Sequence, residues 1–260
     1  FLFLLLWSNQ QEIKNKELPT VNFAQLLIMV AKVSPDLRVR FSTSHPKDMT
    51  DEVLHAMASF ENICNYIHLP VQSGSNKVLK AMNRQHTREE YIKLVENIFQ
   101  IIPDCSISHD MISGFPNESE KDHNDTLSLM EKVKYSFGYM FKYSERPGTL
   151  AAKKLEDNID EETKSRRLSE IVELQQKHSL NRSKEFVGKT VEVLIEKESK
   201  KSNLHWAGRN QQNTTVVFPK ENYNIGDFVN GDFNGTGTLY SVDGEIIQGK
   251  WLHGNLVDNF

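Results

Sequence analysis

The residues best suited to bind a small molecule form a short polar loop, Gln72 to Ser75. Gln72 offers an amide, Ser73 and Ser75 offer hydroxyls, and Gly74 gives the backbone freedom. The loop stands between an apolar segment and a short helix expected at 76–82. Polar groups at the mouth of a helix suit a carboxylate or the hydroxyls of a sugar. The structural alternative is that Ser75 only caps this helix.

Two carboxylates and two guanidiniums extend the set of candidate binding groups. Asp110 and Glu118 flank the turn Gly114-Phe-Pro116, where an acidic side chain could hold a ribose. Glu118 could equally be a charge in the first turn of the helix that follows. Arg84 and Arg146 stand at expected loop positions, where they could bind a carboxylate or a phosphate in fork geometry or remain solvated.

A further group of residues has the character of an RNA-binding surface. Basic side chains occur near aromatic ones in the last third of the chain, and such groups contact phosphates and stack on bases. The residues are Lys200, Lys201, Arg209 and Lys220, with Trp206 and Phe218 among them. Residues 188–230 contain six basic and five acidic residues, and the whole chain has a net charge of −4. Attraction to nucleic acid must therefore come from a local patch.

The sequence gives little support to a metal site. The two cysteines, Cys64 and Cys105, are far apart and form neither a C-x2-C nor a C-x3-C-x2-C spacing. We expect two reduced thiols in buried strands. The nine histidines form no zinc-binding helix face.

Alternating helices and strands must position these groups. Hydrophobic spacing and capping residues predict strands at 37–42, 64–70, 105–112 and 137–143, and helices at 23–30, 51–57, 76–82, 88–98, 118–133 and 160–187. Thr20 is the expected N-cap of the first helix, Thr87 and Glu90 form a capping box, and Gly188 ends the last helix. This order indicates the parallel βαβ units of a β/α barrel, in which functional groups gather at the carboxyl ends of the strands.

The chain is expected to divide into three parts. Residues 1–187 form the partial barrel and end with the long helix, whose expected buried stripe is Leu168, Ile171, Val172 and Leu174. Strands at 191–195, 214–218 and 225–229 predict a small all-β, OB-like domain at 188–230. Residues 231–260 form two glycine-punctuated hairpin halves similar to one MORN-type repeat, with Tyr240 and Trp251 in strand positions.

The first seven residues, Phe-Leu-Phe-Leu-Leu-Leu-Trp, are apolar but too few to span a bilayer. They lack the basic region and the cleavage site of a signal peptide. A barrel strand is the structural interpretation, and a start inside a larger reading frame explains the missing initiator Met. We therefore expect no membrane partner.

Several of these segments together resemble one enzyme family, the radical-SAM methylthiotransferases, and most closely its MiaB type. The matching motifs are His68-Leu-Pro-Val-Gln-Ser-Gly-Ser75, Met82-Asn-Arg84, Thr87-Arg-Glu-Glu-Tyr91, Gly114-Phe-Pro-Asn-Glu118 and Tyr143-Ser-Glu-Arg-Pro-Gly-Thr149. Lys200, Lys201, Gly208-Arg209 and Asn213 fit the TRAM domain, the RNA-binding module of that family. The resemblance runs from about Trp7 to Val229, in the family's order.

The resemblance implies a partial radical-SAM (β/α) barrel followed by a TRAM domain. It implies insertion of a methylthio group at C2 of an N6-isopentenyladenosine beside the anticodon of tRNA. S-adenosylmethionine would serve as methyl donor and as the source of a 5′-deoxyadenosyl radical. By matching motif, Gln72, Ser73, Ser75, Asp110 and Glu118 would line the S-adenosylmethionine pocket, and Arg84 and Arg146 would support its rim. It also implies tRNA as partner, a cytoplasmic location and, at full length, a monomer.

Two departures from the family pattern limit what this chain is expected to do. The family holds two 4Fe–4S clusters, and its C-x3-C-x2-C loop follows a first barrel strand that is missing here, so Cys64 and Cys105 match neither ligand set. A radical-SAM cluster needs three thiolates, and the chain alone should not hold one. The barrel should also show an open parallel edge, because its first strands are absent. From about Gly231 the end of the TRAM domain is replaced by the MORN-like hairpin.

The leading hypothesis is therefore the C-terminal part of a tRNA methylthiotransferase that is inactive alone. One alternative is a non-enzymatic RNA-binding fragment or chimera, in which the TRAM domain and the barrel rim form an interaction surface. Another is a MORN-type structural protein. The upstream reading frame would separate the first two, because a C-x3-C-x2-C motif there supports the enzyme.

Overall fold

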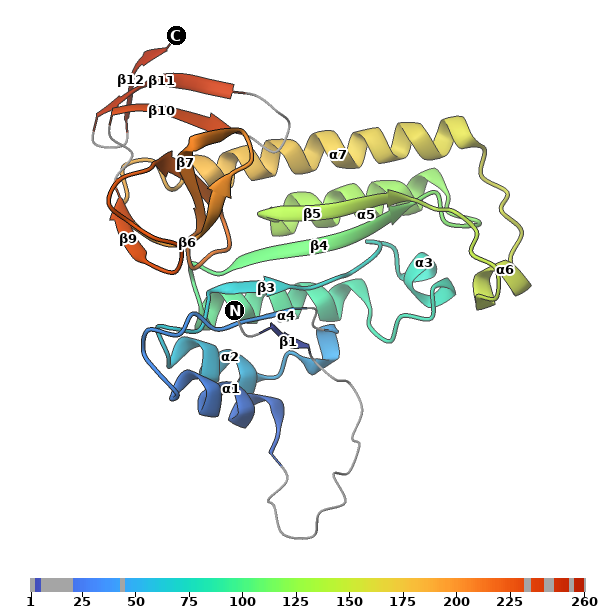
Figure 1. Cartoon of the computed structure of the whole chain (residues 1–260). Helices are drawn as coiled ribbons and strands as arrows, with labels where there is room; N and C mark the ends of the chain where they lie inside the picture. The colour runs from blue at the N-terminus through green and yellow to red at the C-terminus, as the bar shows by residue number, and fades with distance from the viewer. Residues whose placement is uncertain are drawn as a thin grey trace. The chain divides into compact units, whose positions relative to one another are not determined.

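The computed structural model describes residues 3–5, 21–42, 45–231, 235–240, 246–252 and 255–259, with side chains for 21–42 and 45–230. The chain separates into two compact units, residues 1–175 and 176–260. Figure 1 shows the elements in chain order. The expected domain boundaries at 187 and 230 stay a prediction.

Five parallel strands form the sheet of the first unit. They are β1 Phe3–Leu5, β2 Arg40–Ser42, β3 Tyr66–His68, β4 Ser106–Ser113 and β5 Phe137–Lys142. β1 pairs with β2, while β3, β4 and β5 pair in this order and lie side by side in Figure 1. A parallel bridge between Val39 and Ile63 joins the two groups. Within the described residues β5 pairs on one side only, with β4. The open edge expected at the first strands stays a prediction.

Helices connect the successive strands, because parallel pairing requires a crossover each time. α1 Phe23–Ala31 precedes β2, α2 Asp51–Ala58 precedes β3, α3 Asn76–Ala81 and α4 Arg88–Ile101 precede β4, α5 Glu120–Val133 precedes β5, and α6 Leu150–Lys154 and α7 Glu161–Lys184 follow it. The α/β class and the order of elements predicted from the sequence are confirmed. Thr149 caps α6, a helix that the turn-rich sequence did not reveal.

Two local expectations are wrong. The N-cap of α1 is Asn22, whose side chain accepts a hydrogen bond from the Gln25 amide at 2.9 Å, while Gln25 Oε1 accepts one from the Asn22 amide at 3.0 Å. The expected cap, Thr20, lies outside the described residues. Cys64 and Cys105 are free and buried, but they stand just before β3 and β4 rather than inside them.

The core of the first unit is a large apolar cluster between the sheet and its helices, and a small second cluster is formed by Val78, Phe115 and Tyr143. Ile67 and Ile107 from the strands and Leu27, Leu54 and Leu129 from the helices are at most 1% exposed. In the part of the chain that is described, no helix is both long and apolar enough to span a membrane.

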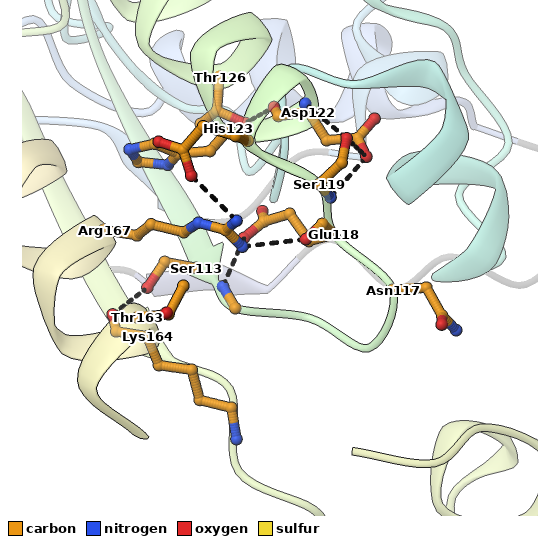
Figure 2. A network of polar contacts seen from close by, with 12 residues as sticks. Ser113, Asn117, Glu118, Ser119, Asp122, His123, Thr126, Thr163, Lys164 and Arg167 are labelled. Carbon is orange, nitrogen blue, oxygen red and sulfur yellow. Dashed lines mark hydrogen bonds and ion pairs between the residues drawn. The ribbon is translucent and has the colours of Figure 1, made fainter. Parts of the chain in front are cut away.

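The buried side of α7 differs from the expected stripe. Lys164, Arg167, Ile171 and Gln175 are buried, at spacings of one helix face, whereas Leu168, Val172 and Leu174 are only partly buried. The polar members have partners in the unit. Arg167 Nη1 donates to a carboxylate oxygen of Glu118 at 3.0 Å, and both side chains are at most 5% exposed (Figure 2).

The second unit begins within α7 and holds two antiparallel sheets. β6 Val191–Ser199, β7 Ser202–Arg209, β8 Thr215–Pro219 and β9 Phe228–Gly231 form the first sheet in the order β8-β7-β6-β9. β7 was not predicted, because its sequence is polar and the strand is defined by its pairing with β6. β10 Gly235–Tyr240, β11 Ile246–Leu252 and β12 Asn255–Asn259 form the second sheet.

Replacing Arg167 by alanine should lower the free energy of unfolding by about 3–5 kcal/mol, because it leaves the buried Glu118 carboxylate without its cation. Arg166→Ala is the matched control. Arg166 is the neighbour of Arg167 on α7 and makes only exposed ion pairs, with Glu120 and Glu170. Urea unfolding followed by circular dichroism measures both. Equal midpoints for the two variants would contradict a stabilising role for the buried pair.

Candidate functional site

The polar segments after the strands share one edge of the sheet. Since β2 to β5 are parallel, the loops that begin at 43, 69, 114 and 143 all leave from the carboxyl ends of their strands. Thr43 and Ser44 lie outside the described residues, and His45 caps the short 3-10 turn Pro46–Asp48. We call this edge the rim.

The loop from Gln72 to Ser75 is fastened to α5. The Gly74 amide donates to Thr126 Oγ1 at 2.9 Å, and the Ser73 hydroxyl lies 3.3 Å from the same atom. A Cβ on Gly74 would stand 2.4 Å from the backbone oxygen of Asp125, so only glycine permits this approach. The loop therefore owes its position to contacts within the protein.

Ser75 has the structural role that was the alternative in the sequence. Its hydroxyl oxygen accepts a hydrogen bond from the Val78 amide and caps α3, and the same hydroxyl donates to Asp122 Oδ1 at 2.6 Å. Burial opposes ionisation of Asp122, but hydrogen bonds from Ser119, Ser75 and Lys77 hold the pKa of its carboxyl below the usual value. Figure 2 shows the contact with Ser119. The Ser75 hydroxyl is thus committed to an ionised partner.

Glu118 also serves the loop that carries it. It precedes Ser119, the N-cap of α5, so it is not a first-turn charge of that helix. Its carboxylate accepts from the Gly114 amide at 2.7 Å and from Arg167, closing the loop upon itself. Burial raises the pKa of Glu118, and the hydrogen bond from Gly114 and the charge of Arg167 oppose that rise. Figure 2 shows Arg167 reaching into this loop.

Three predicted residues retain groups that can receive a ligand. Gln72 has a left-handed backbone (φ 76°), and within the described residues its side-chain amide has no hydrogen-bond partner. The half-buried Arg84 guanidinium likewise makes no hydrogen bond or ion pair with a described residue. Burial lowers the pKa of Arg84, while the nearby Asp110 carboxylate opposes this shift. Asp110 is 26% exposed and lies 3.4 Å from His68 Nε2.

These three groups come from adjacent elements. The backbone amide of Gln72 donates to the backbone oxygen of Asp110 at 2.9 Å, and this hydrogen bond joins the loop after β3 to β4. Arg84 ends the α3 turn, where its amide donates to the Leu79 oxygen at 2.8 Å. The rim thus presents an amide, a cation and an anion together, a set able to hold a zwitterionic ligand with sugar hydroxyls.

Sequence reasoning missed two histidines beside this set. His68 Nδ1 lies 2.7 Å from Ser108 Oγ, and His86 is 6% exposed with its ring 5.7 Å from that of His45. Burial, with His45 and Arg84 nearby, lowers the pKa of His86 to about 4, so the ring is neutral at pH 7. A single histidine at a helix entry gives no sequence signal for such burial.

The remaining predicted residues belong to other elements. Arg146 is exposed, and its backbone oxygen accepts from the Thr149 hydroxyl at 2.9 Å. In the second unit Lys200 and Lys201 occupy the exposed turn between β6 and β7. Lys220 pairs with Glu198 and lies 4.4 Å from the centre of the Trp206 ring, and Arg209 lies 3.5 Å from Glu196.

Two family models match the chain. The radical SAM superfamily matches residues 18–130, and the TRAM domain matches residues 184–230. The tRNA-2-methylthio-N(6)-dimethylallyladenosine synthase of Christiangramia forsetii is 68% identical over 208 residues, which are 80% of this chain and 43% of that protein. The synthase of the same name from Flavobacterium johnsoniae is 66% identical over 210 residues, 81% of this chain and 44% of that protein. The chain spans less than half the length of these two relatives.

The fold of the chain is also similar to that of a solved radical SAM enzyme. Coproporphyrinogen III oxidase from Escherichia coli aligns with a TM-score of 0.50 and 15% sequence identity, over 72% of this chain and 51% of that one. At this identity the similarity shows the fold alone. Residues 18–130 thus match the radical SAM superfamily and residues 184–230 match the TRAM domain, and about four fifths of the chain is similar to part of the two synthases.

Proposed function

We propose that this chain supplies the S-adenosylmethionine rim and the RNA-binding domain of a tRNA methylthiotransferase that acts on an N6-isopentenyl-type adenosine. The proposal extends to a monomeric, cytoplasmic protein. The observation that carries it is the set of Gln72, Arg84 and Asp110 on a radical SAM fold. Within the described residues the side chains of Gln72 and Arg84 make no hydrogen bond and Asp110 contacts His68, whereas Ser73, Ser75 and Glu118 are hydrogen-bonded within the protein.

Each of the three groups suits one part of S-adenosylmethionine. Arg84 would hold the carboxylate in fork geometry, Asp110 would accept hydrogen bonds from ribose hydroxyls, and Gln72 would offer both a donor and an acceptor. Ser73, Ser75 and Glu118 would shape the pocket through the loops that they fix, and Arg146 would approach only from the exposed loop. When bound with its cluster, S-adenosylmethionine supplies the methyl group and the radical of this family's chemistry.

An iron–sulfur cluster does not fit the residues of this chain. Cys64 and Cys105 are 1% and 3% exposed, and Arg40 Nε donates to the Cys64 sulfur at 3.1 Å. Burial raises the pKa of the Cys64 thiol, which disfavours the thiolate that binds iron. The described residues hold no group of three His, Cys, Asp or Glu able to bind a metal. We therefore assign the cluster ligands of the active enzyme to polypeptide other than these 260 residues.

The second unit supports the RNA-binding part of the proposal. Lys200 and Lys201 project from one turn, where two charges can neutralise adjacent phosphates. Lys220 and Trp206 stack as a cation–π pair, and Arg209 ends β7, the strand that also carries Trp206. Since Lys220 and Arg209 already face glutamates, we assign the main electrostatic contribution to the β6–β7 turn.

Arg84→Ala should weaken binding of S-adenosylhomocysteine, a stable analogue, about tenfold or more, because a charge-assisted hydrogen bond contributes about 1.5–3 kcal/mol. Lys80→Ala, an exposed cation on the neighbouring helix turn, is the matched control and should bind as the parent does. Isothermal titration calorimetry measures all three proteins. Unchanged affinity in Arg84→Ala would remove Arg84 from the site.

Reconstitution of the chain with iron and sulfide should give no stoichiometric 4Fe–4S absorption in the visible range, because three thiolates are needed. The variant Cys64→Ser/Cys105→Ser should show the same background as the parent. A cluster present once per chain, with a spectrum that changes when S-adenosylmethionine is added, would show that the chain is competent alone.

Lys200→Ala/Lys201→Ala should weaken tRNA binding about tenfold at low salt and lower the slope of log affinity against log salt by about 1–2. The control Lys32→Ala/Lys93→Ala removes two exposed lysines from the first unit. Fluorescence anisotropy with a labelled tRNA at several salt concentrations gives both quantities. Equal slopes for the two double variants would exclude the turn as the phosphate contact.

A further inference from the structure

A row of aromatic side chains lines the open face of β5. Phe137, Tyr139 and Phe141 alternate along the strand, so they share one face. Tyr139 is 51% and Phe141 53% exposed, and the Phe137 and Tyr139 rings pack edge to face with centroids 4.9 Å apart. The intervening residues face the other way. A Cβ on Gly138 would stand 2.2 Å from His109 Nε2, and Met140 packs on the core.

The row continues directly into the candidate S-adenosylmethionine site. Tyr139 is the register partner of Asp110 on β4, and its ring meets that of His68 at a centroid distance of 6.0 Å. Phe141 is the register partner of Ile112. A flat group lying on Tyr139 would therefore be a neighbour of the ligand that the proposed function places at Asp110.

The charged side chains around the aromatic row indicate which kind of ligand it can bind. The carboxylate beside Tyr139 is that of Asp110, and Lys142 at the end of β5 is paired with Glu161 at 2.7 Å. The Arg84 guanidinium near Asp110 is the group that the proposed function assigns to the carboxylate of S-adenosylmethionine. With these two cations engaged, a neutral heterocycle with a hydrocarbon substituent matches the exposed rings better than a phosphate or an acidic peptide does. Enzymes that modify a base commonly take it out of the stack and hold it against aromatic side chains.

We propose that Tyr139 and Phe141 form the stacking surface for an N6-prenylated adenine and select it over adenine. This inference rests on the proposed function and assigns the recognition of its base to two residues. Tyr139 stacks on the purine ring, and Phe141, one pleat further along the strand, contacts the apolar substituent. Both are substrate-contacting residues that no motif in the sequence indicated.

The test uses the 260-residue chain and two nucleosides, N6-(dimethylallyl)adenosine and adenosine. Equilibrium dialysis should show the prenylated nucleoside bound about tenfold more tightly, because its dimethylallyl substituent is removed from water when it contacts the aromatic row. Tyr139→Ala and Phe141→Ala should each reduce this preference to about threefold or less. Tyr139→Phe keeps the ring and should keep the preference.

Met29→Ala provides the matched control, since Met29 is an exposed apolar side chain of the same unit and lies on α1. It should retain the parent's preference, and unfolding midpoints establish that all variants are folded. If one alanine variant is unfolded, the other carries the test. Equal binding of the two nucleosides by the parent overturns the inference, as does a preference that survives both alanine changes.

The outcome is separable from that of the proposed function. Because the nucleosides need neither tRNA nor a cluster, loss of the salt-dependent tRNA binding or of the Arg84 effect would overturn the proposed function and leave the nucleoside preference measurable. If a polypeptide segment rather than a base covers the row, the parent shows no preference for the prenylated nucleoside, which also overturns the inference.

Discussion

The buried ion pair between Glu118 and Arg167 is the constraint on which the rim depends. It joins the loop after β4 to α7, and the same guanidinium nitrogen also donates to the backbone oxygen of Glu118 at 3.0 Å. Gly114 has φ +70°, and a Cβ there would stand 2.3 Å from Lys164 Cγ, so the loop and the helix fit only with glycine at this position. A buried pair is costly to desolvate and costlier to break. Its contribution is to fix one arrangement of the loop.

The rim divides its polar residues into those that build it and those left to bind. Ser73 and Ser75 are hydrogen-bonded to residues of α5, and Glu118 is hydrogen-bonded to Arg167 of α7. The Asp122 carboxylate accepts from Ser75, from Lys77 and from both the amide and the hydroxyl of Ser119. Such groups have little capacity left for a ligand, because each hydrogen bond to a ligand would replace an existing one. Hence a polar loop can match a family motif in full although only part of it touches the ligand.

The sequence predicted the order of elements well because hydrophobic period and capping residues act locally. The Thr87–Glu90 capping box and the α4 stripe depend on residues within two turns of each other. The buried face of α7 was predicted wrongly, since its positions at Lys164, Arg167 and Gln175 are filled by polar residues. Lys164 pairs with the nearby Asp157, but the partners of Arg167 and Gln175 are distant in the sequence. Helical phase alone could have marked Arg167 as one turn before Ile171, but not its partner Glu118, 49 residues earlier in the chain.

The sequence predicted which residue types belong to the candidate site, but their positions relative to one another are set by the pairing of the strands. The parallel register that sets Asp110 opposite Tyr139 also brings the loop of Gln72 beside β4. None of these contacts uses a metal ligand, and the ion pairs that hold the rim are internal to the first unit. The described contacts that organise the rim therefore need no iron–sulfur cluster, which is compatible with the proposal that this chain supplies the S-adenosylmethionine side of the site. That follows from the fold, since the barrel positions ligand-binding loops by packing them on helices, whereas a cluster is positioned by cysteines of its own.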